Sequence, residues 1–287
     1  MKRIPAAIVI SLALAGLLAL TPEAARAQSA GPAPQQVTLF ELVLRDGSRM
    51  YGEIEREDDT EVIFRTRGGT VMTVKRTDIL SLRRRTGVLA GQEFQRADPN
   101  TTRLFFGPTG KSLEKGQSYV GVYEVLLPFV QVGVTDRFSI GAGTPLIFGA
   151  GSNHPFWITP KLQIVNTGST QAAVGVLQGF SGDSSAGIAY VVGTHGTALG
   201  SFSAGAGLAY ESDGGRAGVV MAGGQRQVRQ GLAVISENYL WKGGNGIVSL
   251  GVRFFGERLS ADLGLAAPIG GGFIIFPVVN FVYLFER

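Results

Sequence analysis

One short run of residues carries side chains that could perform hydrolysis. Ser152, Asn153 and His154 bring together a hydroxyl, an amide and an imidazole, the groups from which a nucleophile–base pair is built. The three residues are adjacent on a Gly-flanked loop, where a nucleophile–base hydrogen bond is seldom preserved. The sequence therefore favours an ordinary loop and keeps a hydrolase that uses Ser152 and His154 as an alternative.

A second run, residues 107–112 (Gly-Pro-Thr-Gly-Lys-Ser), resembles the end of a phosphate-binding loop. The full pattern needs a glycine where Phe105 stands, and it needs a helix after the run. The residues that follow lead into a strand, so a surface hairpin is the favoured interpretation.

Metal and redox chemistry have few side chains available. The chain has no cysteine and only two histidines, His154 and His195, which makes disulfides, thiolate sites and a multi-histidine metal centre improbable. His195 lies in a predicted turn, where we expect it to be solvated. We expect no cofactor and no enzymatic activity.

The first 27 residues have the features of a secretory signal peptide. A basic start is followed by an apolar run over residues 8–20, and residues 25–27 (Ala-Arg-Ala) form a cleavage site. The apolar run is shorter than the ~20 residues of a membrane-spanning helix. The leader carries Lys2, Arg3, Arg26 and Glu23, so the net charge falls from +4 to +2 without it. This balance gives no reason to expect a nucleic-acid partner.

Charge density divides the rest of the chain. After a flexible lead-in over residues 28–36, residues 37–85 hold 19 charged side chains, whereas the whole of 101–287 holds 22. We predict a small soluble β-domain over 37–85, a linker over 86–100 and a second domain over 101–287. Arg83, Arg84 and Arg85 are predicted to be a solvated basic stretch, with an anionic-lipid contact as the alternative.

The small domain is predicted to contain five short strands separated by turns, with a short helical turn before the fifth. Residues 44–54 (Leu-Arg-Asp-Gly-Ser-Arg-Met-Tyr-Gly-Glu-Ile) and 74–79 resemble the opening and closing strands of SH3-like and Sm-like β-barrels. The resemblance implies that fold. Domains of this family often bind peptides or RNA, but no binding residue is identifiable here.

Residues 101–287 show a repeated alternation of apolar with small or polar residues, the pattern of transmembrane barrel strands. Turn signals separate eleven strands between residues 119 and 285, and residues 102–106 are predicted to be the twelfth. Because bacterial barrels have an even strand number, we predict twelve antiparallel strands, with ten as the alternative. A soluble β-sandwich is less favoured, because the faces opposite Gly and Ser are almost wholly apolar.

Period-two alternation assigns eight polar side chains to the lumen. They are predicted either to form a charged constriction that selects solutes or to fill a narrow barrel with internal ion pairs. Three of them fall on consecutive strands and are predicted to lie side by side, namely Glu237, Arg253 and Asp262. The full set is Glu124, Lys161, Gln163, Gln171, Glu237, Arg253, Asp262 and Asn280.

Aromatic residues near strand ends are candidates for interfacial girdles. They are Tyr119, Tyr123, Trp157, Tyr210, Tyr239 and Trp241, with Phe129 and Phe180 as further members. The alternating Phe281, Tyr283 and Phe285 resemble the C-terminal signal of bacterial outer-membrane proteins, although Glu286 and Arg287 follow. This resemblance implies an outer-membrane location, lipid contact and insertion by the barrel-assembly machinery.

Taken alone, the sequence predicts an outer-membrane barrel preceded by a periplasmic domain. The barrel is predicted to be either a narrow solute channel or a closed structural barrel, and the domain over 37–85 to contact a periplasmic or envelope protein. The alternatives are the lipid hydrolase described above and a secreted soluble β-protein.

Overall fold

The computed structural model of the chain describes residues 36–90, 93–146, 154–270 and 274–285. The predicted signal peptide, most of the lead-in and Ser152 lie outside these residues. The chain divides into two compact units, Ser29–Ala97 and Asp98–Arg287, with the boundary inside the predicted linker.

The smaller unit is a six-stranded antiparallel sheet whose strand order is β4-β3-β2-β1-β5-β6. Its core contains Leu42, Val62, Phe64 and Val74, and along β3 the buried Val62 and Phe64 alternate with partly exposed residues. The predicted helical turn is a single 3-10 turn, η1. The elements are β1 (Gln36–Leu44), β2 (Arg49–Glu57), β3 (Glu61–Thr66), β4 (Val71–Lys75), η1 (Arg76–Asp78), β5 (Ile79–Ala90) and β6 (Glu93–Arg96).

The predicted linker over 86–100 is wrong for its first part. Residues 79–90 form one continuous strand that pairs with β1, and β6 then pairs back onto β5. Arg83, Arg84 and Arg85 lie within this strand, where Arg83 and Arg84 are exposed and Arg85 is partly buried. The fall in charge density therefore does not coincide with the end of the sheet, which continues to Arg96.

Two carboxylates organise this small sheet. Asp58 accepts hydrogen bonds from the Thr60 amide, the Thr60 hydroxyl and the Glu61 amide at 2.8–2.9 Å. These hydrogen bonds, the Thr60 amide first, lower the pKa of Asp58 to about 2. Glu41 is buried between β2 and β5, where Arg85 Nε donates to it at 2.8 Å and the Tyr51 hydroxyl at 3.0 Å. Burial acts to raise the pKa of Glu41, but the hydrogen bonds from Arg85 and Tyr51 lower it overall.

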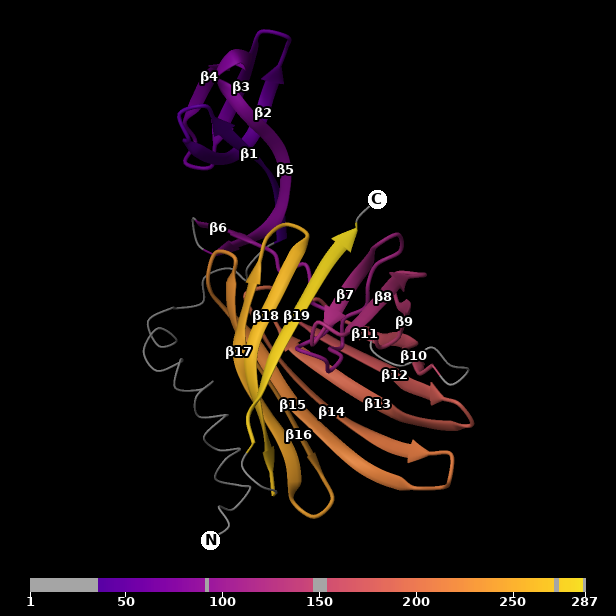
Figure 1. The fold of residues 1–287 in the computed structure, drawn as a ribbon. Coiled ribbons are helices and arrows are strands. Elements are labelled where there is room, and N and C mark those ends of the chain that lie inside the picture. Colours follow the sequence, from indigo (N-terminus) through magenta and orange to yellow (C-terminus); the bar gives the residue numbers. More distant parts are fainter. Residues whose placement is uncertain (1–35, 91–92, 147–153, 271–273, 286–287) are drawn as a thin grey trace. The chain divides into compact units, whose positions relative to one another are not determined.

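The larger unit is a closed antiparallel β-barrel (Figure 1). β10 and β11 both pair with β9 and β12 and are two halves of one strand, so the described residues form twelve strands around the barrel. Pairing of β19 with β7 closes the ring. The strands are β7 (Ser118–Tyr123), β8 (Leu127–Gly133), β9 (Phe138–Gly143), β10 (Phe156–Ile158), β11 (Lys161–Asn166), β12 (Thr170–Ser181), β13 (Ser184–Gly196), β14 (Gly200–Glu211), β15 (Arg216–Arg229), β16 (Leu232–Trp241), β17 (Asn245–Phe255), β18 (Leu259–Ile269) and β19 (Phe276–Phe285).

The prediction of twelve strands is confirmed, but one strand was assigned to the wrong residues. Between residue 119 and the next turn signal, at Thr135, the sequence predicts a single strand, whereas the chain turns at Glu124 and Val125, which adopt φ values of 49° and 62°. Neither residue type favours this left-handed conformation, so the turn carried no sequence signal. Residues 102–106 are not a barrel strand. Their only β-bridge within the described residues joins Arg103 to Pro108.

The outer face of the barrel is apolar. Leu250, Leu265 and Phe254 are each about half exposed there, as are Phe281, Tyr283 and Phe285 on β19. An apolar exterior around polar interior side chains is the arrangement of a transmembrane β-barrel, and it removes the soluble β-protein alternative. Among the described residues, no helix has the length and apolar character needed to cross a bilayer.

Candidate functional site

The interior of the barrel is occupied by the chain segment that precedes β7. We call residues 98–113 the plug segment. Leu104 and Phe105 within it have no exposed surface and pack against Ile235 of β16 and Val278 of β19. Because these barrel residues face inward from separate strands, the plug segment crosses the lumen instead of lying along its wall.

Arg253 of β17 anchors the start of the plug segment. Its guanidinium bonds Asp262 of β18 at 2.6 and 3.0 Å and Asp98 at 3.0 Å. It also donates to the carbonyl oxygens of Asn100 at 2.7 Å and Leu104 at 2.6 Å. All three charged side chains are almost fully buried. One cation thus connects two carboxylates and two plug carbonyls.

Glu237 of β16 holds the tip of the plug segment. Its carboxylate accepts hydrogen bonds from the amides of Phe106 at 3.0 Å and Gly107 at 2.9 Å, and from the Tyr239 hydroxyl at 2.8 Å. A side chain at Gly107 would collide with the Tyr239 hydroxyl. The tip therefore depends on a carboxylate acceptor and on a glycine.

The far side of the plug segment is bound by β11 and β13. Gln163 Nε2 donates to the Gly110 carbonyl at 2.9 Å, and the Gly110 amide donates to the Thr194 hydroxyl at 2.8 Å. Lys161 Nζ donates to the Thr102 carbonyl at 3.1 Å. The amides of the phosphate-loop-like run are thus committed to protein acceptors at Gly107 and Gly110, which opposes a phosphate site there.

Seven of the eight polar residues assigned to the lumen are interior side chains with no more than 6% exposure. Most of them contact the plug segment, as described for Lys161, Gln163, Glu237 and Arg253, and Asn280 Nδ2 donates to the Phe105 carbonyl at 3.1 Å. Gln171 contacts the Gly168 carbonyl. Glu124 differs, because it lies in the β7–β8 turn, where its amide meets Asn280 Oδ1 at 3.3 Å.

The expected cluster of Glu237, Arg253 and Asp262 forms only in part. Arg253 and Asp262 are register partners on adjacent strands and share two hydrogen bonds. Glu237 pairs in register with Ser249 and turns to the plug tip instead. Sequence reasoning assigned these side chains to the interior but missed the plug segment to which they bind.

Arg103 is a second guanidinium inside the barrel, and it is partly buried. It donates to the Tyr119 hydroxyl at 2.9 Å, the Gln131 side-chain oxygen at 3.0 Å, the Phe106 carbonyl at 3.1 Å and the Thr159 hydroxyl at 3.4 Å. Its Cζ lies 4.7 Å from the centroid of the Phe129 ring. Every one of these partners is neutral.

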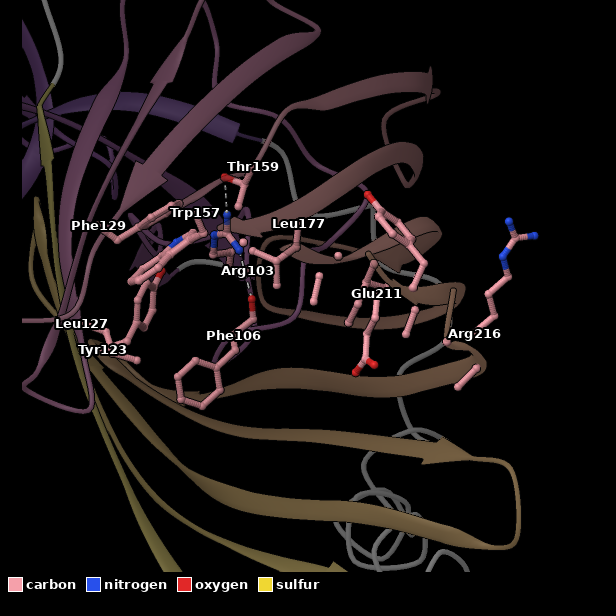
Figure 2. Close-up of a pocket in the computed structure, with 18 residues that line it drawn as sticks. Arg103, Phe106, Tyr123, Leu127, Phe129, Trp157, Thr159, Leu177, Glu211 and Arg216 are labelled. Carbon is pink, nitrogen blue, oxygen red and sulfur yellow. Dashed lines mark hydrogen bonds between the residues drawn. The ribbon is translucent and has the colours of Figure 1, made fainter. Parts of the chain in front are cut away.

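A cavity of about 620 Å³ lies beside Arg103 and the plug tip. Figure 2 shows Tyr123, Phe129 and Trp157 gathered on one side of it and Glu211 and Arg216 on the opposite side. A second cavity of about 130 Å³ shares Arg103, Phe106 and Leu177 with the first and continues toward Tyr190 and Tyr239. The interior beyond the plug segment is therefore a largely aromatic and apolar space, with Arg103 in its wall beside the aromatic residues and Glu211 and Arg216 on the opposite side.

The girdle assignment is wrong for most of the aromatic residues. Tyr119 and Tyr123 are buried inside the barrel with Phe129, Trp157 stacks on Phe129, and Tyr239 bonds Glu237. These rings cannot contact lipid, because they fill the interior. Tyr210 bonds Gln178 at 2.6 Å, Phe180 stacks on Phe156, and Trp241 is 36% exposed at the end of β16.

Neither of the two histidines is part of an assembled reaction centre within the described residues. His154 is exposed, and its predicted partner Ser152 lies outside those residues. His195 Nδ1 lies 2.8 Å from the Thr170 hydroxyl on the neighbouring strand. Within the same described ranges, no group of three or more metal-ligating side chains is gathered.

Comparison with known proteins finds no matching family model and no matching curated protein. Among solved structures, the chain is similar to the KdgM porin in complex with disordered oligogalacturonate, with 7% identity, a TM-score of 0.47 and coverage of 59% of this chain and 98% of that one. The NanC porin matches at 9% identity and a TM-score of 0.42, covering 60% of this chain and 98% of that one. Pseudomonas aeruginosa OprD matches at 11% identity and a TM-score of 0.37, with 91% and 97% covered. The twelve-strand barrel itself is established by the register of this chain's own strands.

Proposed function

We propose that the protein is an outer-membrane barrel whose lumen is closed at rest by the plug segment and which conducts small solutes only when that segment moves. The observation that carries this proposal is the zero exposure of Leu104 and Phe105 in the middle of the barrel. The polar lumen side chains were predicted either to fill the barrel with internal ion pairs or to form a solute-selecting constriction. In this proposal they fill the barrel while the plug segment is in place, and they line a narrow passage once the plug segment has moved.

The apolar exterior of the barrel and the sequence features at the two ends of the chain support an outer-membrane location. The apolar exterior requires lipid, and the predicted signal peptide directs export. The aromatic alternation at Phe281, Tyr283 and Phe285 supports insertion by the barrel-assembly machinery, with the C-terminus on the periplasmic side.

Planar-bilayer conductance of the parent and of Glu237→Gln tests the proposal. The substitution keeps the shape of the side chain but replaces a charged acceptor of the Phe106 and Gly107 amides by a neutral one, which weakens each hydrogen bond. We expect a nearly silent parent and discrete opening steps in the variant. Asp183→Asn, in the exposed β12–β13 turn, is the matched control and stays silent.

Two results contradict the proposal in different ways. A folded parent that conducts steadily would mean that the plug segment leaves an open path. Silence in Glu237→Gln and in a variant lacking residues 102–109, with both shown to be folded, would mean a closed structural barrel.

We also propose that the domain over 37–85 is an SH3-like module in the periplasm that contacts an envelope protein. Its support is the meander of β1–β4 with β5 pairing onto β1, together with the exposed Leu80 and Val71. Protease added to intact and to permeabilised cells tests the compartment. Cleavage within 37–85 only after permeabilisation agrees with the proposal, and cleavage in intact cells contradicts it.

A further inference from the structure

We propose that the cavity beside Arg103 binds a single-chain amphipathic anion, such as a fatty carboxylate, with its charged head on Arg103 and its chain along the aromatic wall. This inference does not depend on whether the plug segment moves, because the cavity exists with the plug in place.

The first argument is the unbalanced charge at Arg103. Buried charges in proteins are paired in the great majority of cases, and Arg253 in the same barrel follows this rule with two carboxylates. For Arg103, no carboxylate of the described residues comes within salt-bridge distance, and its hydrogen bonds all go to neutral oxygens. Lys161, 2% exposed, likewise donates to a carbonyl. An anion at Arg103 therefore finds a cation that no carboxylate pairs with, because Glu211, which also lines the cavity, lies on its opposite side (Figure 2).

The second argument is the shape and lining of the cavity. Its volume of about 620 Å³ falls within the ~300–1,000 Å³ of typical small-molecule sites. Phe106, Trp157 and Leu177 line it together with small residues of β12–β15 such as Ala209. Mostly apolar walls beside the Arg103 guanidinium select a ligand with an apolar body and an anionic end, and they disfavour a sugar or a short polar solute.

The third argument is the height of the barrel wall. β7, β8 and β9 have 6, 7 and 6 residues, whereas β12–β15 have 12 to 14. A tilted strand needs about 9–11 residues to cross a bilayer, so β7–β9 form a low stretch of wall.

The rim of this low stretch is apolar. Val125 and Leu126, in the β7–β8 turn, are 55% and 43% exposed, and Leu146 beside them is 62% exposed. The Leu146 amide donates to the Leu126 carbonyl at 2.8 Å, which keeps the rim together. Tyr123 and Leu127 flank the turn and line the cavity. A ligand dissolved in the lipid can therefore reach the cavity over this rim.

Fluorescence of Trp157 measures occupancy directly. The chain has two tryptophans, so Trp241→Phe leaves Trp157 in the cavity as the sole reporter. The protein is folded into phosphatidylcholine vesicles and titrated with bromine-labelled dodecanoate and, separately, with the matching bromine-labelled dodecanol, because bromine quenches tryptophan at contact. We expect saturable quenching, with dodecanoate at least about tenfold tighter than the uncharged alcohol, the effect of a hydrogen bond to a charged group.

Two variants separate a site from partition into lipid. Arg103→Lys retains the preference for the carboxylate, and Arg103→Gln loses it. Ala209→Phe fills the cavity and removes the saturable part of the quenching while leaving the barrel folded. This second variant keeps the test decisive if Arg103→Gln fails to fold.

Three results would overturn the proposal. They are equal affinity for dodecanoate and dodecanol, quenching that does not saturate, and saturable quenching that survives Ala209→Phe. Conductance measured on the same vesicles reports separately on the plug segment, so failure of the binding site and failure of the proposed channel are distinguishable.

Discussion

Two arginines inside one barrel, Arg253 of the wall and Arg103 of the plug segment, have opposite surroundings. Arg253 forms ion pairs with Asp98 and Asp262, and its remaining donors meet backbone carbonyls. Arg103 has only neutral oxygens and the ring of Phe129 around it. The charge of Arg253 is thus neutralised by carboxylates, whereas the charge of Arg103, beside the cavity, has no carboxylate partner. The contrast indicates that Arg253 serves stability, whereas Arg103 retains the capacity to bind an anion.

The largest effect is expected at the balanced arginine. Arg253→Gln leaves Asp98 and Asp262 buried without a cation, and breaking a buried pair in this way costs about 3–5 kcal/mol. Denaturant unfolding of the refolded barrel in lipid vesicles measures the loss. Arg258→Gln, an exposed arginine in the β17–β18 turn, is the matched control. A loss below about 1 kcal/mol in Arg253→Gln would show that the anchor is not structural.

A smaller loss is expected at the unbalanced arginine. Arg103→Gln removes hydrogen bonds to Tyr119 and Gln131, but it also removes a desolvated cation without a carboxylate partner. We expect a net loss of about 1–2 kcal/mol, measured by the same unfolding experiment. If Arg103→Gln destabilises the barrel as strongly as Arg253→Gln, Arg103 is a second structural anchor, and the proposed difference in role between the two arginines is wrong.

The difference between Arg253 and Arg103 can also be removed by introducing a carboxylate partner for Arg103. Gln131 is buried, with its side-chain oxygen 3.0 Å from Arg103 Nη2, so Gln131→Glu introduces a negative charge with little change of shape. We expect the affinity for bromine-labelled dodecanoate to fall about tenfold and that for the alcohol to stay the same. Ser139→Ala, which removes the hydroxyl that accepts a hydrogen bond from Gln131 Nε2, is the control. Unchanged dodecanoate affinity in Gln131→Glu would contradict the role of Arg103.

Much of this interior was predictable from alternation alone. The residues Lys161, Gln163, Glu237, Arg253 and Asp262 were assigned to the lumen by their parity, and all five are buried there. Alternation succeeds because the side-chain period of a strand is two and only one face can contact lipid.

The aromatic residues were misassigned for two different reasons. Tyr239 has the same parity as Glu237, so alternation placed it in the lumen, but its position near a strand end predicted a girdle. Tyr119 and Tyr123 have the parity opposite to that of Glu124, which was predicted to face the lumen. Because the unpredicted β7–β8 turn takes Glu124 out of the strand, alternation counted from that residue gave the wrong face for both tyrosines.

The plug segment could not be found in this way. An extended segment inside the barrel alternates like a barrel strand, so residues 102–106 resembled a twelfth strand. What distinguishes it is its set of long-range partners, such as Glu237 for the Phe106 amide. These contacts join residues more than a hundred positions apart, and no local pattern encodes them.

The smallest effect is expected at an arginine–carboxylate pair in the small domain. There Arg85 bonds the buried Glu41, while Arg49 approaches the same carboxylate from solvent at 3.5 Å. Because the pKa of Glu41 is lowered in the folded state, its contribution to stability is present above its ordinary value of 4.5 and is lost as the pH falls through the folded-state value. We expect a change of about 1 kcal/mol or less, since part of the pair is screened by water.

Hydrogen exchange of β1 and β5 in the full chain, corrected for intrinsic rates, measures this change across acid pH. Glu41→Gln removes the titrating group, so its protection loses this acid dependence. Glu53→Gln, an exposed carboxylate of the same sheet, retains it. Identical acid profiles for the parent and Glu41→Gln would mean that the Arg85–Glu41 pair adds nothing to folding. The pair would then differ from Arg253 and its carboxylates, whose loss is expected to destabilise the barrel strongly.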